Sequence, residues 1–284
     1  MMKAIAAALV LTASTAFAMP VEVTRPIVRM NFDKAFINTF DFEGIVKLSN
    51  CSGALIQFEG SSENKKAVVM TNGHCADLPG GFLQPGQVLV NQDVSRTVGI
   101  FDSKMKLNRV KAKKILFATM TDTDVTLYEL EVSYKDIKDK FGVNPLTLAS
   151  NHPAVGTETQ IISGYWEKGW DCSMEAFIPK LREDAWTWID SIRYNPECDT
   201  THGTSGSPII ERNTRTIVGI NNTGNDNGEQ CTMDNPCEVS TDGSIRVAQG
   251  TSYGQETYQI YSCLNKNFDI DLKKEGCMLP KATK

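Results

Sequence analysis

The sequence lacks the cysteine and histidine spacings that mark metal-binding proteins. None of its eight cysteines forms a C-x-x-C pair, and its three histidines, His74, His152 and His202, are far apart. We therefore expect no zinc site, no other metal and no cofactor. Internal repeats and low-complexity segments are also absent, and the net charge of -5 gives no support for nucleic acid or an anionic membrane as a partner.

Long hydrophobic runs are absent after the N-terminal region, and a membrane-spanning helix needs roughly 20 apolar residues. The first residues, MMKAIAAALVLTASTAFAMP, place Lys3 before a short apolar stretch, Ala4 to Thr12, and the small residues Ala16 and Ala18 follow. This order is typical of a secretory signal peptide, so we expect residues 1–18 to be removed after Ala18. A buried N-terminal helix is the alternative. The signal peptide predicts a secreted or periplasmic protein with no membrane contact after cleavage.

The eight cysteines are an even number, and behind an export signal they predict disulfides. Cys51 precedes one expected strand and Cys75 follows another, so a bridge between them would tie neighbouring strands. Pairing by nearness in sequence predicts three more bridges, Cys172–Cys198, Cys231–Cys237 and Cys263–Cys277. An exchange between Cys198 and the Cys231/Cys237 loop stays open, because spacing does not fix connectivity.

Short runs rich in β-branched residues fill most of the chain, which predicts an all-β protein. These runs are GIVKL, SGALIQF, KAVVMT, QVLVN, RTVGIF, VTLYELEV, TQIISGYW, SPIIE, TIVGINN and SIRVA. Lys104 to Lys114 alternates basic and apolar residues, as in a strand with one solvated face, and a partner-binding patch is the alternative. Helical periodicity is found mainly in TYQIYSCLNKNF. Leu146 to Thr157, with Pro153 and Gly156, is the best boundary between two β-rich halves.

One stretch, THGTSGSPII, sets Ser205 between glycines and makes it a candidate nucleophile. Gly203 and Gly206 allow a tight turn and close approach of a substrate. The amides of Gly203 and Ser205 could then converge on one oxygen, as an oxyanion hole requires. An ordinary turn before a strand has the same composition, so a nucleophilic serine needs a base and an acid supplied by other segments.

A histidine and a carboxylate are available at expected strand ends. His74 follows the apolar run Ala67 to Thr71 in a polar turn, where a rigid strand end positions a base well. Asp124 stands at the start of VTLYELEV and could accept the Nδ1 hydrogen of an imidazole. Asp122, two residues earlier, is the alternative candidate for this acid. Taken singly, the histidine and either aspartate also fit as ordinary surface residues.

His74, Asp124 and Ser205 occur in this order, each on its expected element, and the sequence here resembles the trypsin-like (chymotrypsin-fold) serine proteases. The segments CSGALI, AVVMTNGHC, DVTLYEL and GTSGSP carry the resemblance, which covers roughly Gly44 to Leu264. CDTTHGTSGSP looks closest to the bacterial glutamyl-endopeptidase-like branch. The resemblance implies an all-β fold of two packed antiparallel Greek-key β-barrels with a C-terminal helix.

The same resemblance implies a secreted serine endopeptidase, a monomeric hydrolase acting on proteins or peptides. Ser205 would attack the scissile carbonyl, His74 would act as base and then acid, and Asp124 would orient the imidazole. The implied organisation is a signal peptide at 1–18, a possible propeptide or N-terminal extension at 19–43, a first barrel at 44–150, a second barrel at 151–262, and the end of the helix with a disulfide-tied tail at 263–284.

The residue before the nucleophile departs from the animal digestive branch of that family. That branch has an aspartate there, which pairs with the new N-terminal amine after activation. Thr204 cannot form this ion pair, so we expect the oxyanion hole to form without it.

The substrate site is less sharply indicated. Asp199 lies at the counted position of the trypsin branch's pocket acid and would favour Lys or Arg substrates. The glutamyl branch uses a histidine on the substrate-side strand, where this chain has Asn221 and Asn222, so a preference for acidic substrates is not expected. The resemblance also places Thr200, His202 and Gly250 at the substrate site, and His152 is expected on the surface.

Two further classes of function are considered. One is a catalytically silent relative that binds peptides or proteins, and the other is a disulfide-rich structural or adhesive β protein, which would require three motifs to occur in order by chance. The stretch NNTGNDNGEQ has the composition of a calcium loop but lacks a glutamate at the required spacing, so we expect an ordinary polar loop there.

Overall fold

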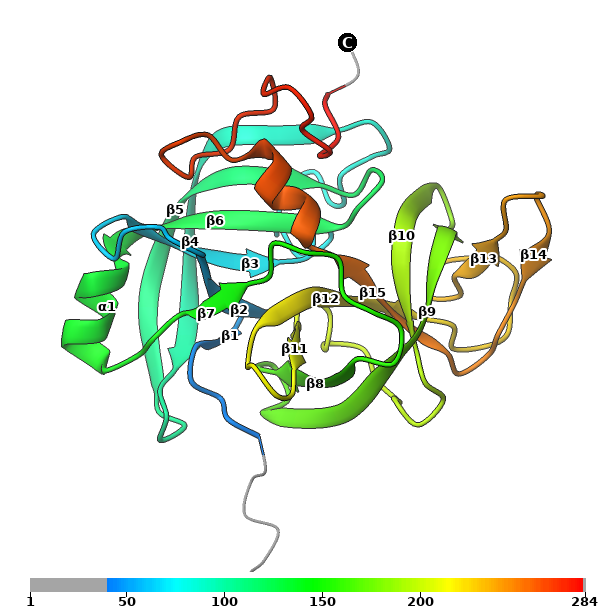
Figure 1. Ribbon diagram of the computed structural model, residues 1–284, viewed down its shortest axis with the longest axis horizontal. Coiled ribbons are helices and arrows are strands. Elements are labelled where there is room, and N and C mark those ends of the chain that lie inside the picture. The colour runs from blue at the N-terminus through cyan, green and yellow to red at the C-terminus, as the bar shows by residue number, and fades with distance from the viewer. Residues whose placement is uncertain (1–39, 283–284) are drawn as a thin grey trace, which may run out of the picture. The chain divides into compact units, whose positions relative to one another are not determined.

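The computed structural model describes residues 40–282, which are mostly β-structure (Figure 1). The first elements are β1 (Ile45–Lys47), β2 (Ser52–Phe58), β3 (Lys66–Thr71), β4 (Val88–Phe101), β5 (Leu107–Thr119), β6 (Val125–Ser133), α1 (Tyr134–Phe141) and β7 (Leu146–Leu148). They are followed by β8 (Glu158–Ser163), β9 (Lys168–Glu183), β10 (Trp186–Tyr194), β11 (Pro208–Glu211), β12 (Ile217–Gly224), β13 (Cys237–Val239), β14 (Ile245–Arg246), β15 (Ser252–Glu256) and the 3-10 helix η2 (Tyr258–Cys263). The expected signal peptide and most of the segment 19–43 lie outside the described residues.

The strand pairing closes on itself in two places. β1, β4, β5, β6, β3 and β2 neighbour one another in this order, and β2 pairs again with β1. β12, β11, β8, β9, β10 and β15 do the same, and β15 pairs again with β12. The short strand β7 runs parallel to β2 on one side and to β12 on the other, so it joins the two rings of strands (Figure 1). Closed pairing leaves fewer unpaired strand edges than an open sheet would.

The apolar runs of the sequence form the buried strands. Every residue of β2 except Gln57 is buried, and β3 is buried from Ala67 to Thr71. In β5 the side chains of Val110 and Ala112 are buried while Lys111 between them is exposed. From Leu107 onward the basic stretch is a strand with one solvated face, as its alternation predicted, whereas Lys104 to Lys106 lie before β5.

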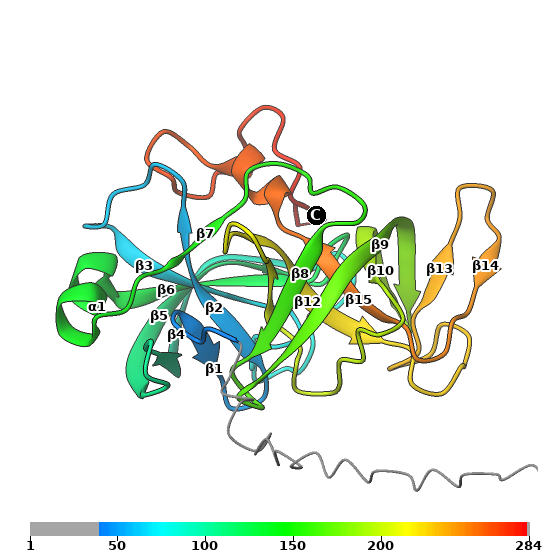
Figure 2. The same ribbon diagram turned by 60° about the horizontal axis from the view of Figure 1, so that its bottom comes forward.

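One long strand and one hairpin differ from the predicted elements. QVLVN and RTVGIF, predicted as separate strands, belong to the single strand β4, whose pairing with β5 shifts between Asp93 and Arg96. β9 and β10 form a long hairpin that the sequence did not predict, because its exposed residues break the apolar runs. Figure 2 shows this hairpin beside β13, which pairs with β9.

The helix α1 has no counterpart among the predicted elements. Ser133 caps its N-terminus: the Ser133 side chain accepts from the Asp136 N–H at 3.1 Å, and the Asp136 carboxylate accepts from the Ser133 N–H at 2.8 Å. Gly142 ends the helix with a φ of 70°. A capping box followed by a glycine was thus present in the sequence and indicates this short helix.

The predicted C-terminal helix is wrong in type and length. TYQIYSCLNKNF forms only the 3-10 helix η2, and Leu264 after it is extended. The Cys263 carbonyl, which a continuing α-helix would use internally, accepts instead from the Asp271 N–H at 2.7 Å. The returning tail therefore replaces the next helical turn.

The four disulfides join the pairs predicted by nearness in sequence. They are Cys51–Cys75, Cys172–Cys198, Cys231–Cys237 and Cys263–Cys277. The last ties the tail to the end of η2. The exchange involving Cys198 does not occur.

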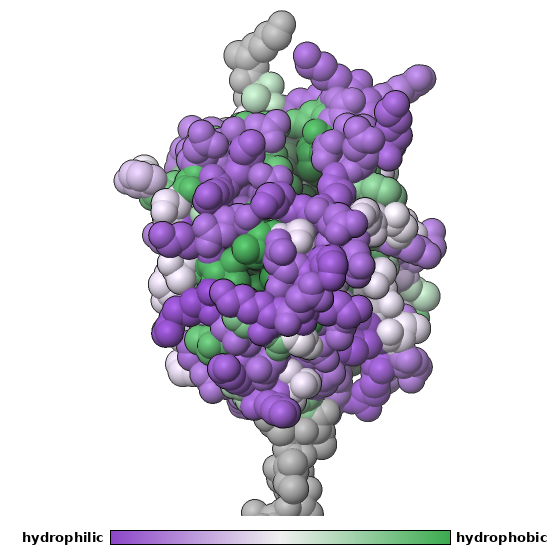
Figure 3. All heavy atoms as spheres, turned by 90° about the vertical axis from the view of Figure 1, so that its left-hand side faces the viewer, coloured by the Kyte–Doolittle hydropathy of each residue, from purple (hydrophilic) through white to green (hydrophobic). Residues whose placement is uncertain are grey.

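The surface over α1 is mostly hydrophilic, with hydrophobic residues visible in the hollows between polar ones (Figure 3). No helix within residues 40–282 is long and apolar enough to cross a membrane.

Candidate active site

Pairing between β3 and β6 places His74 beside Asp124. Thr71 at the end of β3 faces Thr126 near the start of β6, so the turn after β3 meets the residue before β6. His74 Nδ1 lies 2.8 Å from Asp124 Oδ2, and the His74 N–H donates to Asp124 Oδ1 at 3.0 Å. The Asp124 side chain is fully buried. These contacts fix the imidazole by one nitrogen and leave Nε2 for another partner.

Asp122, the rival acid, does not contact His74. It is exposed, and its backbone bridges to β10, where its N–H donates to the Thr187 carbonyl at 3.2 Å and its carbonyl accepts from the Ile189 N–H at 2.9 Å. Its role is to hold the β6 entry against β10.

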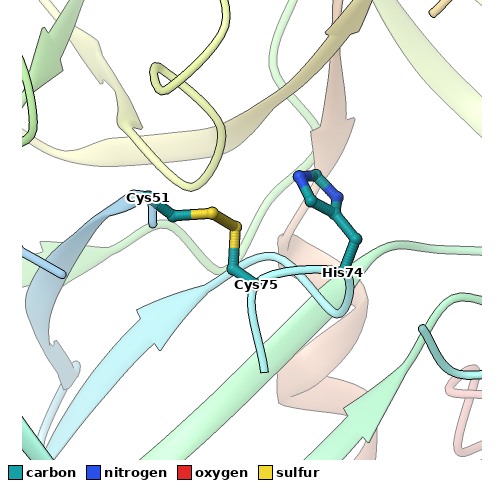
Figure 4. A group of neighbouring side chains, drawn as sticks. All are labelled: Cys51, His74 and Cys75. Atoms are coloured by element: carbon teal, nitrogen blue, oxygen red, sulfur yellow. A yellow bond between two sulfur atoms is a disulfide. The ribbon is translucent and has the colours of Figure 1, made fainter. Parts of the chain in front are cut away.

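A disulfide holds the turn that carries His74 (Figure 4). Cys75, the next residue, is joined to Cys51 just before β2, and one ring nitrogen of His74 lies within 4.8 Å of both sulfurs. Because both sulfurs are bonded to each other, these cysteines offer no thiolate for a metal beside His74.

Ser205 lies in a loop pinned to both rings of strands. The Ser52 N–H of β2 donates to the Ser205 carbonyl at 2.8 Å, and the Gly206 N–H donates to the Asn221 carbonyl of β12 at 3.0 Å. The Ser205 hydroxyl donates to the Asn222 carbonyl at 3.2 Å, and within residues 40–282 it makes no hydrogen bond to His74. The serine, His74 and Asp124 line one cavity of about 410 Å³.

The loop before Ser205 leaves two amides available to an oxyanion. Gly203 has a φ of 86°, and no group in the described part of the chain accepts from the N–H of Gly203 or Ser205. The Gly203 carbonyl accepts from the Ser52 hydroxyl at 3.2 Å, which fixes the direction of that peptide. Oxyanion holes for acyl transfer are built from free backbone N–H groups of this kind.

Thr204 holds the loop through its hydroxyl. This residue is 2% exposed, and Oγ1 donates to the Thr201 carbonyl and accepts from Asn221 Nδ2 at 3.0 Å. Neutral hydrogen bonds to Thr201 and Asn221 thus fix Thr204 within the loop.

Acidic side chains raise the pKa of His74. Burial of the ring lowers this pKa, but Asp124 raises it through charge and hydrogen bonding, and Glu183 and Asp234 add to the effect. The resulting pKa lies above the ordinary value of 6.5. Burial also raises the pKa of Glu183 to about 6, against the hydrogen bond that it accepts from the Asp234 N–H.

The structure brings only some of the expected substrate residues to the cavity. Four of them line it: Thr200, His202, Asn221 and Asn222. Asp199 is exposed and, like Gly250, does not line it. The His202 ring is exposed and bonds to Asp226, with Nε2 and Oδ2 2.7 Å apart, and this hydrogen bond raises the pKa of His202.

Several lining residues were missed by sequence reasoning. They are Phe82, Glu183, Trp186, Trp188, Thr223, Gly224, Asp226, Met233 and Asp234, among others. Thr223 and Gly224 follow Asn222 on the same strand and could have been found from that position. Glu183 and the tryptophans come from the unpredicted β9–β10 hairpin, and no local pattern marks them.

The sequence matches the family described as trypsin-like peptidase domain over residues 51–220. The chain belongs to the trypsin-like peptidase family. The matched segment of this peptidase contains His74, Asp124 and Ser205. No curated protein matches it in sequence.

Solved structures of proteases resemble this trypsin-like peptidase at low identity. The apo protease domain of MamO from Magnetospirillum magneticum is 13% identical, with a TM-score of 0.48 over 79% of this chain and 97% of that chain. The Nocardiopsis protease is 15% identical, with a TM-score of 0.42 over 76% and 93%. Neuropsin, a serine protease expressed in mouse brain, is 15% identical, with a TM-score of 0.42 over 76% and 89%.

Gly206 permits the close approach of the serine loop to β2. We therefore expect the stability of the protein to fall sharply when a methyl group is added at this position. A Cβ on Gly206 would lie 2.2 Å from the Ser52 carbonyl oxygen and 2.3 Å from Thr71 Oγ1. We expect Gly206→Ala to lower the free energy of unfolding by about 3 kcal/mol or more, from overpacking added to a φ of 80°. Denaturant unfolding measures this loss.

Gly243→Ala is the matched control, because Gly243 has a φ of 85° but open space around it. It should lose only the left-handed backbone penalty, about 1–2 kcal/mol. Equal losses in the two variants would contradict the role of close approach.

Proposed function

We propose that this trypsin-like peptidase is a secreted serine endopeptidase that cleaves peptide bonds in proteins or peptides as a monomer. The observation that carries the proposal is the His74–Asp124 pair, held at 2.8 Å beside Ser205 in one cavity. Each ring of strands would be one antiparallel Greek-key barrel of the trypsin-like fold, with a division near residue 150. The glutamyl-endopeptidase-like branch is inferred from CDTTHGTSGSP.

In this mechanism Ser205 Oγ attacks the scissile carbonyl carbon while His74 Nε2 takes its proton. Asp124 keeps the hydrogen of His74 on Nδ1 and stabilises the imidazolium that forms. The N–H groups of Gly203 and Ser205 donate to the oxygen that becomes negative. His74 then returns the proton to the leaving amine. In the second half of the reaction, water attacks the acyl-enzyme in place of Ser205, with His74 again taking the proton and then returning it to Ser205 Oγ.

The substrate backbone is proposed to lie along β12 beyond Asn222. Thr223 and Gly224 continue this strand into the cavity wall, and an extended peptide added beside them gains main-chain hydrogen bonds. Glu183, Asp226 and Asp234 line the same cavity, whereas one of its two histidines, His202, is already paired with Asp226. We infer that the cavity favours positively charged substrate side chains.

A catalytically silent, peptide-binding relative is the second candidate. The observation in its favour is the Ser205 hydroxyl, which donates to the Asn222 carbonyl and not to His74. Rotation about one side-chain bond changes that partner, and catalytic hydrogen bonds often form only with substrate bound.

Replacing the nucleophile separates the two candidates. We expect Ser205→Ala to lower kcat/KM for a peptide library by about 10⁴-fold or more and to abolish labelling by an organophosphonate. Ser207→Ala is the matched control: its buried hydroxyl has no hydrogen-bond partner in the described chain, so its activity should stay within about twofold of wild type. Full activity of Ser205→Ala, or no labelling of the wild type, would contradict the serine endopeptidase and favour the catalytically silent relative.

The raised pKa of His74 predicts the acid side of the pH profile. The imidazole accepts a proton only when neutral, so activity is lost as the pH falls through its pKa, and the midpoint should lie above 6.5. Asp124→Asn should move that midpoint down and lower kcat, because it removes the main charge that stabilises the imidazolium. The measurement is kcat/KM from pH 5 to 9, and a wild-type midpoint below 6.5 would contradict the assignment.

Glu183→Gln tests the charge of the cavity. The test peptides carry Lys, Arg or Leu at one position before the scissile bond, and each position is varied in turn. At one of these positions, the ratio of kcat/KM for the Lys or Arg peptide to kcat/KM for the Leu peptide should fall roughly 10-fold or more in the variant. In the wild type the same ratio should fall as the pH drops through about 6, where Glu183 gains a proton. Glu229→Gln, an exposed change outside the cavity, should leave the ratio unchanged. An unchanged ratio in Glu183→Gln would rule out Glu183 as the selector.

A further inference from the structure

A second cluster of a histidine and two acids lies outside the active-site cavity. His152 comes from the loop between β7 and β8, Asp190 from β10 and Glu256 from the end of β15. None of the three lines the cavity of Ser205. Their nearest ligand atoms, one from each residue, all lie within 4.8 Å of one another.

Strand pairing sets the two carboxylates against each other. Ser191 of β10 faces Gln255 of β15 in an antiparallel register, so Asp190 and Glu256 are the next pair along. Like charges directly opposite on a sheet are destabilising unless a positive group lies between them. Glu256 is only 3% exposed, and within residues 40–282 neither of its carboxylate oxygens has a hydrogen-bond partner.

The imidazole of His152 is oriented as a ligand. Its Nδ1 lies 2.6 Å from the Pro153 carbonyl, which can only accept, so Nδ1 carries the hydrogen. In the neutral ring the lone pair is then on Nε2, which faces both carboxylates. The rings of Phe177 and Tyr258 hold the imidazole on two sides, with centroids at 4.3 and 5.1 Å. Three electron-pair donors thus point at one another.

The two distances from His152 Nε2 to the carboxylates match those between ligand atoms of a tetrahedral ion. His152 Nε2 lies 3.3 Å from Asp190 Oδ2 and 3.6 Å from Glu256 Oε1. Zinc bonds to nitrogen and oxygen of about 2.0–2.2 Å at tetrahedral angles place neighbouring ligand atoms about 3.4 Å apart. The Tyr258 hydroxyl donates to Asp190 Oδ2 at 3.3 Å, which is the kind of outer contact that orients a ligating carboxylate.

We propose that His152, Asp190 and Glu256 bind one divalent zinc ion, with water as the fourth ligand. A nitrogen with two carboxylate oxygens suits zinc, whereas calcium takes six to eight oxygen ligands and magnesium a near-octahedral set. The His152 and Asp190 side chains are about one-third exposed, so the ion can enter from solvent. The site joins the β7–β8 loop to β10 and β15, and its role is to stabilise this part of the fold. The ligands come from three distant segments, which is why their spacing in sequence gave no zinc signal.

The experiment is a calorimetric titration of ZnCl₂ into the full chain without a histidine tag, with CaCl₂ and MgCl₂ as separate arms. We expect one zinc ion per chain, no comparable binding of calcium or magnesium, and a higher Tm with zinc than with EDTA. His152→Ala and Glu256→Gln should each weaken zinc binding about 100-fold and remove the rise in Tm. His152 is partly exposed, so its variant keeps the test valid if Glu256→Gln fails to fold.

His202→Ala is the matched control, since it removes a second histidine that is also paired with an aspartate. Its zinc binding should equal that of the wild type. Cobalt bound to the wild type should give the absorption of a four-coordinate ion, and His152→Ala should lose it. The proposal is overturned if zinc does not bind, if His152→Ala binds as tightly as the wild type, or if calcium binds at the site in place of zinc.

Discussion

The close contact between the serine loop and β2 is the constraint on which the site depends. The Ser52 backbone holds the Ser205 carbonyl at 2.8 Å, the Ser52 hydroxyl holds Gly203, and Gly206 has no room for a Cβ. The same loop is bonded to β12 through the Asn221 carbonyl. Since β2 belongs to one ring of strands and β12 to the other, this loop brings Ser205 to the cavity that it shares with His74 and Asp124, which come from the opposite ring.

Because Asp124 is buried, the interaction between His74 and Asp124 is strong, and it also depends on the other hydrogen bonds around the pair. A fully buried carboxylate is unfavourable unless it is bonded, and Asp124 receives the His74 ring, the His74 N–H and, at its backbone carbonyl, Asn72. The Cys51–Cys75 bridge keeps the turn in place next to these bonds. Removing one contact would therefore disturb the others, and the site is expected to respond to mutation as a unit.

The site residues that could be predicted from the sequence are those marked by their immediate neighbours along the chain. Ser205 between glycines, His74 after an apolar strand and Asp124 before one are each marked by their neighbours, and spacing sufficed for the disulfides. Glu183 was missed because the β9–β10 hairpin brings it to the cavity by long-range pairing, which no local pattern reveals. Asp199 was placed at the substrate site by counting along the chain, yet a count does not say which way a loop residue points, and this one is exposed. The 3-10 helix replaced an α-helix because the returning tail competes for the Cys263 carbonyl.

The two histidine–carboxylate clusters differ in the group that Nδ1 of the histidine faces, and this difference suits them to different chemistry. At His74 the Nδ1 hydrogen faces a carboxylate, which stabilises the charged ring and makes Nε2 a better base. At His152 it faces a neutral carbonyl, while Nε2 is turned toward two acids. A base needs an acid behind it and a substrate in front, whereas a metal ligand needs its lone pair among other donors. We therefore propose that the same residue type on the same fold serves proton transfer in one place and metal binding in the other.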